Sequence, residues 1–279
     1  MRIAWLMLDG VGLRTAEDFL GNPFYQLELP TLKKLGITTP TVTIQPDLTT
    51  KPIDANLDVQ GLPQSGTGQT TILTGINASK ALGFHHGPWV SPSLVPILEQ
   101  NILKQIGDVR LANFYPARYL ESLASGKTKL NAIATSALSA GARLENESGL
   151  GISPLLRPLE ENSSLAQIKN WAKEFMNSQA KITIFDLWWT DSVGHEMNLA
   201  EAQALAFRLE QFCKYCLTYQ DQNTLFLITS DHGNFEDLRV KTHTRNPVPL
   251  VAVGQGANHF AQVLSLVDIA KAVLTVMKV

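Results

Sequence analysis

Short apolar runs, each followed by polar or glycine residues, recur along the chain and predict buried strands. They cover residues 3–8, 109–114, 181–187, 224–229 and 250–253. Between many of these runs the apolar residues recur at helical spacing, over residues 94–105, 164–176, 199–219 and 263–277. Strands that alternate with helices indicate an α/β fold, with a mostly parallel sheet and helices on both faces.

The remaining stretches predict loops within one domain. Proline, glycine and serine are frequent around residues 40–70, 84–94 and 140–158, and no internal repeat or low-complexity tract interrupts the pattern. A chain of 279 residues lies near the upper limit for a single hydrophobic core, and we expect one domain spanning residues 1–279.

Composition and charge restrict the partners. Apolar residues make up 44 % and charged residues 17 % of the chain, which favours a globular protein with a sizeable core. A net charge of −2 provides no general field for nucleic acid or an anionic membrane, so an anionic substrate must be held by local charges. The first apolar run is too short for a signal peptide and no run suggests a membrane span, so we expect a cytoplasmic protein.

The two cysteines, Cys213 and Cys216, lie within the helical pattern at 199–219. A redox C-x-x-C motif should begin a helix after a strand, and a zinc site needs a second pair of ligands. Because neither condition is met, we expect packed thiols without a chemical role.

Metal-ligand residue types gather where predicted strands end. In open α/β sheets, ligands bind beyond the carboxyl ends of the strands. Three aspartates and three histidines fall at such positions: Asp9, Asp191, His195, Asp231, His232 and His243. Each one alone would be an ordinary cap or satisfied polar residue, but six of them at one edge would be costly without a compensating cation. Together with one hydroxyl they would serve two metal ions, with donors suited to zinc or manganese.

The stretch "LPQSGTGQTT" at 62–71 is superficially similar to a phosphate-binding P-loop. In that register Pro63 replaces the first glycine and Gln69 replaces the lysine, while the preceding residues 51–61 look too polar for a buried strand. We therefore interpret the loop as presenting the Ser65 hydroxyl at the start of a helix, whose N–H groups and dipole would face a phosphate.

The motifs "LDGVG" (8–12), "DSVGH" (191–195), "SDHGN" (230–234) and "THTRNPVP" (242–249) resemble those of the alkaline phosphatase superfamily. The resemblance is to the branch that holds cofactor-independent phosphoglycerate mutase and phosphopentomutase. It implies that Ser65 is the nucleophile and that one metal is held by Asp191, His195 and His243. The other metal would be held by Asp9, Asp231, His232 and Ser65, and manganese or zinc is expected, with magnesium as a further candidate.

The chain departs from those mutases in two respects. They insert a cap domain, for which only an excursion at about 84–180 is available here, and part of that excursion reads as core. They also carry histidine where this chain has Gln69. Because an open site admits water to a phosphoenzyme, we expect a phosphatase, hydrolysing a small phosphorylated metabolite through phospho-Ser65.

Other residues are weaker candidates. His85, His86 and Arg118 in the excursion, and Arg245 beside His243, are candidates for substrate contacts. Trp188 and Trp189 are expected to pack beneath the metal loop. A phosphomutase of the same superfamily and a non-catalytic metal-binding module remain open alternatives, and the substrate and oligomeric state cannot be read from the sequence.

Overall fold

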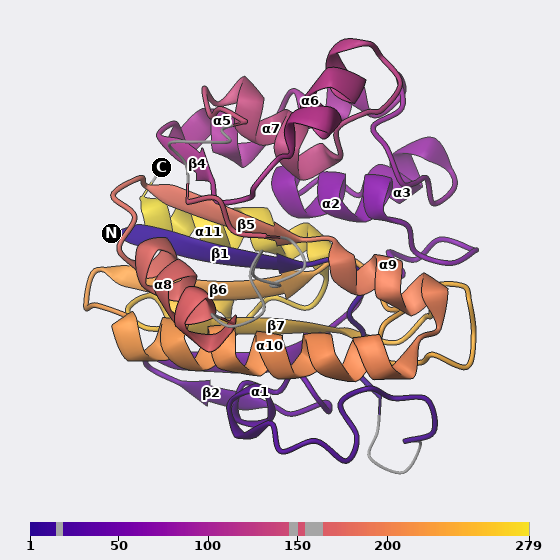
Figure 1. The fold of residues 1–279 in the computed structure, drawn as a ribbon. Helices are drawn as coiled ribbons and strands as arrows, with labels where there is room; N and C mark the ends of the chain where they lie inside the picture. Colours follow the sequence, from indigo (N-terminus) through magenta and orange to yellow (C-terminus); the bar gives the residue numbers. More distant parts are fainter. Residues whose placement is uncertain (15–18, 145–149, 154–163, 279) are drawn as a thin grey trace.

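The computed structural model describes residues 1–14, 19–144, 150–153 and 164–278 of the chain, and it centres on a mixed sheet (Figure 1). The sheet has seven strands in the order β2-β3-β7-β6-β1-β5-β4. Their bounds are β1 (Arg2–Leu8), β2 (Thr43–Gln45), β3 (Leu48–Ile53), β4 (Val109–Leu111), β5 (Ile182–Leu187), β6 (Thr224–Ser230) and β7 (Val248–Val253). β6, β1, β5 and β4 run parallel to one another, whereas β7 is antiparallel to β6, β3 to β7 and β2 to β3. The prediction of an α/β fold with a mostly parallel sheet is confirmed.

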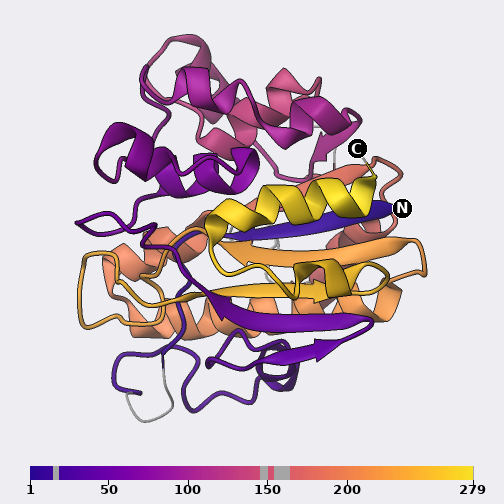
Figure 2. The same cartoon turned by 180° about the vertical axis from the view of Figure 1, so that it is seen from behind.

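Helices cover both faces of the sheet (Figures 1 and 2). Alternate residues of β1 face opposite sides, so Trp5 and Met7 join one core cluster while Leu6 and Leu8 join the other. The first cluster includes side chains of α2 (Ser65–Thr74), α4 (Val95–Leu98), α5 (Ile102–Ile106), α7 (Ala132–Ser139) and α11 (Ile269–Met277). The second includes side chains of α1 (Pro30–Lys34), α8 (Ser164–Met176) and α10 (Leu199–Tyr219). The remaining short elements are α3 (Ala78–Leu82), α6 (Ala117–Ala124), α9 (Trp189–Glu196), η2 (Ala257–Phe260) and η3 (Leu266–Asp268).

Two strands were missed by the sequence patterns. The interpretation of residues 51–61 as too polar for a strand is wrong at its start, because β3 continues to Ile53. β3 lies near one edge of the sheet, and half of its residues, including Lys51 and Pro52, are only partly buried. Such a strand shows no continuous apolar run.

The predicted helices at 164–176 and 199–219 have the predicted bounds in α8 and α10. The pattern at 94–105 is instead divided between α4 and α5, because Asn101 interrupts it: its side chain caps α5 by accepting from the Lys104 N–H. The pattern at 263–277 becomes the short η3 followed by α11.

The excursion at 84–180 contributes β4, α8 and the short helices α4 to α7. β4 pairs with β5, and α8 packs against α10, so both belong to the layers of the core. The short helices α4 to α7 lie around α2, on one side of the molecule (Figure 1). Within the described ranges, no helix combines the length and apolar character needed to cross a membrane.

The cysteines lie in α10 as packed thiols. Cys213 and Cys216 are fully buried and not disulfide-bonded, and burial raises the pKa of both. This confirms the expectation of structural thiols.

A buried carboxylate joins α10 to α1. Glu210 is 2 % exposed, and its two oxygens accept hydrogen bonds from the backbone N–H groups of Thr31 (3.0 Å) and Leu32 (2.9 Å). These are first-turn N–H groups, which have no partner within their own helix.

We expect Glu210→Ala to lower the free energy of unfolding by about 2–3 kcal/mol, because two N–H groups at this junction lose a charged acceptor. Glu210→Gln keeps one acceptor oxygen and nearly the same volume, so its loss should be smaller. Urea denaturation followed by circular dichroism would measure both variants. Equal stability of Glu210→Ala and the unsubstituted protein would contradict this role.

Candidate metal centre

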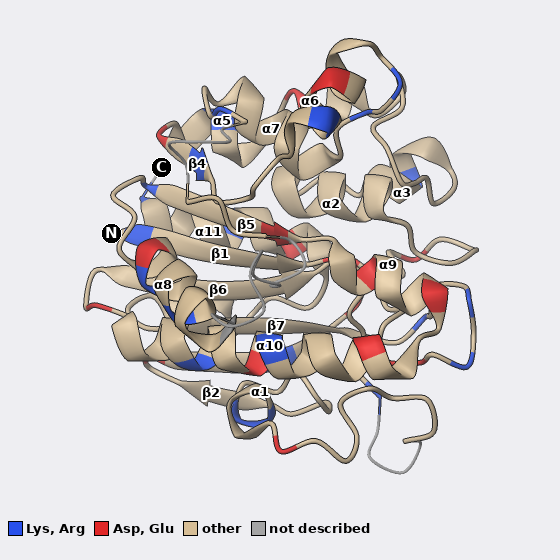
Figure 3. Cartoon of the chain, in the orientation of Figure 1, with Lys and Arg blue, Asp and Glu red and all other residues tan. Residues whose placement is uncertain are grey.

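The carboxyl ends of three neighbouring parallel strands bring the predicted ligands together. β1, β5 and β6 end at the same edge of the sheet, and acidic positions mark this edge at the end of β5 and in α9 (Figure 3). Asp9 follows β1, α9 follows β5, and Asp231 follows β6, while His243 lies in the loop before β7. An unbroken chain of close contacts links all seven predicted residues: Asp9, Ser65, Asp191, His195, Asp231, His232 and His243.

Asp191, His195 and His243 form one compact donor group. Asp191 Oδ2 lies 3.2 Å from His195 Nε2, and Asp191 Oδ1 lies 3.5 Å from His243 Nε2. The donor atoms of the three residues all lie within 4.8 Å of one another, close enough to share a metal ion.

The orientation of the two imidazoles fits a shared cation. His195 Nδ1 donates to the Lys241 carbonyl and His243 Nδ1 donates to the Pro63 carbonyl, each at 2.7 Å. In the neutral form, both Nε2 atoms then carry lone pairs, and they lie 3.2 Å apart. Two lone pairs cannot form a hydrogen bond, whereas both can bind one metal, and a backbone carbonyl on the far nitrogen is the usual support for a metal-bound histidine.

A second donor group surrounds Ser65. Its Oγ lies 2.9 Å from His232 Nε2 and donates to Asp9 Oδ1 at 3.4 Å. His232 Nε2 lies 3.3 Å from Asp9 Oδ1 and 3.8 Å from Asp231 Oδ2. Donor atoms of Asp9, Asp191 and His232 also lie within 4.8 Å of one another, so Asp191 borders both groups.

The electrostatics of the cluster show an excess of negative charge. Burial, followed by the Asp231 carboxylate, raises the pKa of Asp9 well above its usual value. Burial alone would lower the pKa of His232, but Asp231 and hydrogen bonding to Asp9 raise it to about 10. Burial also opposes ionisation of Asp191, yet hydrogen bonds from His195 and His243 lower its pKa overall. The raised pKa values of Asp9 and His232 favour their protonated forms, which offset the negative charge of the carboxylates. Divalent cations would offset the same charge, and the oxygen and nitrogen donors suit zinc or manganese.

Gln69 has a structural role that the sequence did not reveal. Its amide nitrogen donates to Asp9 Oδ2 (3.1 Å) and to Asp231 Oδ2 (3.0 Å). The side chain is fully buried, and its neutral amide group bridges the two carboxylates.

Ser65 is the first residue of α2, as the interpretation of its loop predicts. The glycines that follow allow close packing: a Cβ at Gly66 would come within 2.7 Å of the His86 carbonyl oxygen, and one at Gly68 within 2.9 Å of the Asp231 carbonyl oxygen. Residues 54–64 separate β3 from α2, so the strand that a P-loop requires does not directly precede this helix.

Two supporting residues were also missed. Glu236 is fully buried and accepts from the N–H groups of Gly12 (2.8 Å) and Asn234 (2.9 Å) and from the Asn246 side chain (2.9 Å). The Asn234 side chain donates to Asp191 Oδ1 at 2.7 Å. Both residues fall within or beside the "SDHGN" motif, but only tertiary structure gives them these partners.

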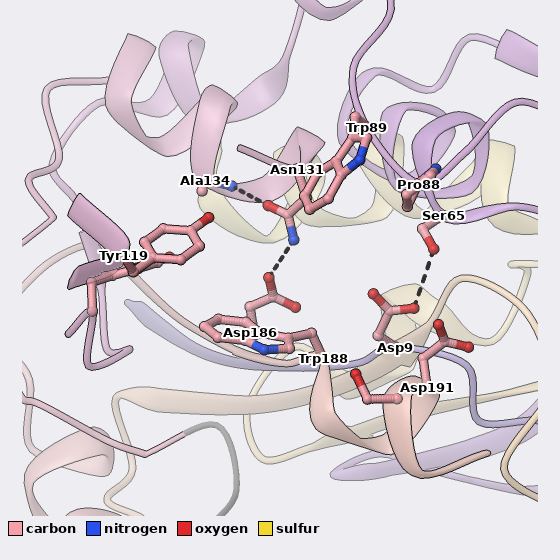
Figure 4. Close-up of a pocket in the computed structure, with 12 residues that line it drawn as sticks. Asp9, Ser65, Pro88, Trp89, Tyr119, Asn131, Ala134, Asp186, Trp188 and Asp191 are labelled. Atoms are coloured by element: carbon pink, nitrogen blue, oxygen red, sulfur yellow. Dashed lines mark hydrogen bonds between the residues drawn. The ribbon is translucent and has the colours of Figure 1, made fainter. Parts of the chain in front are cut away.

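A cavity of about 180 Å³ opens beside Ser65 (Figure 4). Asp9 and Asp191 border it at the metal-ligand side, and Asp186 of β5 lies at the other side. Aromatic side chains complete the wall: Trp89, Tyr115, Tyr119 and Trp188. Trp188 borders the cavity and also packs against the first core cluster, and Trp189 packs against the core cluster of α8 and α10.

The four candidate substrate contacts lie away from this cavity. His85 and His86 border a separate surface hollow with Phe84 and Gly87. Arg118 is exposed on α6, and Arg245 is exposed in the loop after His243. None of the four is among the described residues that line the cavity beside Ser65.

Comparison with known proteins places the chain in a family. The model of the metalloenzyme superfamily matches residues 1–279, so the chain belongs to the metalloenzyme superfamily. No curated protein sequence matches it.

Solved structures share the fold over nearly the whole chain. The PH0037 protein of Pyrococcus horikoshii is 15 % identical, with a TM-score of 0.59, over 99 % of this chain and 96 % of its own. The alkaline phosphatase of the Antarctic bacterium TAB5 is 14 % identical, with a TM-score of 0.57, over 99 % and 97 % of the two chains. A cold-active alkaline phosphatase of a psychrophilic Shewanella is 12 % identical, with a TM-score of 0.59, over 99 % and 100 %.

We expect Asp231→Ala and His243→Ala each to lower affinity for manganese or zinc by at least about a hundredfold, because each loses a direct donor. Metal content after dialysis, measured by inductively coupled plasma mass spectrometry, would test this. Asp221→Ala removes an exposed carboxylate beyond the opposite end of β6 and should leave metal content unchanged. Full metal retention in Asp231→Ala and His243→Ala would contradict the donor assignment.

Proposed function

We propose that the protein is a two-metal phosphomonoesterase that hydrolyses a small phosphorylated metabolite through a phosphoserine intermediate on Ser65. The observation that carries this proposal is the position of the Ser65 hydroxyl at the first residue of α2, between Asp9 and His232 and within the donor cluster. Membership of the metalloenzyme superfamily and the fold shared with alkaline phosphatases support the same reaction class.

The chain's residues divide into two ligand sets. Asp191, His195 and His243 would hold one divalent ion, manganese or zinc with magnesium as a further candidate. Asp9, Asp231, His232 and Ser65 would hold the other. When bound, the two ions lower the pKa of the serine hydroxyl and neutralise phosphoryl oxygens during an in-line displacement.

The reaction consists of two displacements at phosphorus. Ser65 Oγ loses its proton to solvent and forms a bond to phosphorus as the bond to the leaving alcohol breaks, and the leaving oxygen takes up a proton. Water then attacks phospho-Ser65, which returns the serine hydroxyl and inorganic phosphate. The N-terminus of α2 would face the transferred phosphate, although the Thr67 N–H of its first turn donates to the His86 carbonyl at 2.8 Å.

The cavity favours hydrolysis over a phosphoglycerate mutase reaction. A mutase must retain its half-reacted anionic substrate and re-phosphorylate it, which requires cationic side chains around the part of the substrate remote from the nucleophile. The described residues that line the cavity include no lysine, arginine or histidine. We propose, further, that the 84–180 excursion replaces a cap domain within a single domain of residues 1–279, which leaves the site accessible to water.

We expect Ser65→Ala to lower turnover of p-nitrophenyl phosphate by about a thousandfold or more, because the other hydroxyl in the first turn of α2, that of Thr67, is directed to the carbonyls of Gln64 and His86. Phosphate release with manganese or zinc present would be measured beside metal content, which should stay close to that of the unsubstituted protein. Ser125→Ala, at an exposed position, provides the matched control. Unchanged turnover in Ser65→Ala would contradict the assignment of the nucleophile.

A screen of phosphorylated metabolites would separate the two reactions. Free phosphate is the expected product, and an isomerised phosphoester without free phosphate would instead identify a mutase. If neither product formed with any metal or substrate, a non-catalytic metal-binding module would be the better interpretation.

A further inference from the structure

The cavity beside Ser65 combines aromatic walls with a buried carboxyl group that the reaction itself does not use. Asp186 is 1 % exposed and borders the cavity. Its Oδ2 accepts from the Asn131 side chain at 2.6 Å, while its Oδ1 is buried without a hydrogen-bond partner in the part of the chain that the structure describes. A buried carboxylate oxygen without a partner is costly, and such a group is expected to meet a ligand.

No cationic side chain is among the described residues that line the cavity around Asp186. Burial raises the pKa of Asp186, the hydrogen bond from Asn131 lowers it and the Asp231 carboxylate raises it, which together give a value of about 7. Among the described lining residues the ionisable groups are carboxyls and tyrosine hydroxyls, with no cationic side chain. Ionised Asp186 therefore lacks a counter-charge from the described walls of the cavity.

The aromatic rings surround the same space. Tyr115 lies with its ring centroid 5.6 Å from that of Tyr119 and 6.0 Å from that of Trp188. Figure 4 shows Trp188 beside Asp186, with Tyr119 and Trp89 on other sides of the opening. Aromatic faces and a carboxylate both attract cations, and an alkylammonium group uses both.

The cavity and the nucleophile are connected. Ser65 and Asp186 line the same space, so a phosphate at Ser65 directs the rest of its ester towards the aromatic walls. The volume of about 180 Å³ is about six times that of a water molecule in the liquid, which suits a leaving group of a few heavy atoms.

We propose that this cavity binds the leaving group of the substrate, and that this group is a small alkylammonium alcohol held by Asp186 and the aromatic rings of Trp188 and Tyr119. The inference rests on the proposed function and names its substrate class: a phosphate monoester of an amino alcohol, cationic at the end remote from phosphorus. An anionic leaving group such as glycerate would meet Asp186 without a compensating cation.

Two pairs of probes of equal shape test the proposal. Phosphocholine and 3,3-dimethylbutyl phosphate differ only in the positive charge, and so do the corresponding alcohols, choline and 3,3-dimethylbutanol. We expect kcat/KM to be at least about tenfold higher for phosphocholine, and choline to bind at least about tenfold more tightly than its neutral analogue. 3-Phosphoglycerate should be the poorest substrate of the three esters.

Asp186→Asn is the diagnostic variant. The main chain of Asp186 is held by both side-chain groups of Asn113, which accept from its N–H at 3.0 Å and donate to its carbonyl at 2.7 Å, so the strand should keep its position. The variant should lose most of the preference for the charged probes and retain turnover of 3,3-dimethylbutyl phosphate. Tyr119→Leu, at a half-buried position on α6, should also weaken choline binding, whereas Asp221→Asn should change neither measurement.

The binding measurement keeps the two proposals separate. Choline binding that depends on Asp186, without release of phosphate from any ester, would overturn the phosphatase reaction and leave the ligand class standing. Hydrolysis of neutral esters with no preference for the charged probes would overturn the ligand class alone. An unchanged preference in Asp186→Asn would likewise overturn the role of Asp186, and failure of choline to bind at all would overturn the inference whether or not esters are hydrolysed.

Discussion

The structure depends on the confinement of three carboxylates, those of Asp9, Asp191 and Asp231, at one buried edge of the sheet. Their mutual repulsion and loss of water are unfavourable, and the surrounding groups respond to that cost. His232 gains a proton, Gln69 donates to two of the carboxylates, and His195 and His243 direct their ring nitrogens towards the third. Each of these groups partly offsets the negative charge of the carboxylates, as a bound cation would. The cluster is therefore best understood as a site for divalent cations.

The parallel strands make this confinement unavoidable. β1 pairs with both β5 and β6 along its length, so residues immediately after these strands must meet. Glu236 then holds three loops together, because it accepts hydrogen bonds from Gly12 after β1, from Asn234 after β6 and from Asn246 before β7. The predicted ligand residues are thus positioned by regular structure and a buried acceptor, rather than by loops alone.

The sequence predicted those parts of the molecule that local patterns encode. Continuous apolar or helical runs mark β1, β5, β6 and α10, so these elements could be predicted. Residue types that bind metals follow these strands, so the position of the candidate site could be predicted as well. β3 was not predicted, because this strand near the sheet edge has only half of its residues buried, and Lys51 and Pro52 interrupt its apolar pattern. The prediction of a single helix at 94–105 was wrong for a different reason. Asn101 ends the pattern by capping α5, and this cap depends on one side-chain hydrogen bond. Asp186, Asn131 and Gln69 were missed because their importance lies in partners distant in sequence, and no motif marks such residues.

The contact between His232 and His243 links the two halves of the centre. Their rings are stacked with centroids 3.8 Å apart and an interplanar angle of 19°, although the two residues belong to different ligand sets. A cation that fixes one ring also restricts the other, so part of the ordering entropy of the second set is lost when the first is filled. Occupancy of the two proposed metal positions would therefore be thermodynamically linked rather than independent.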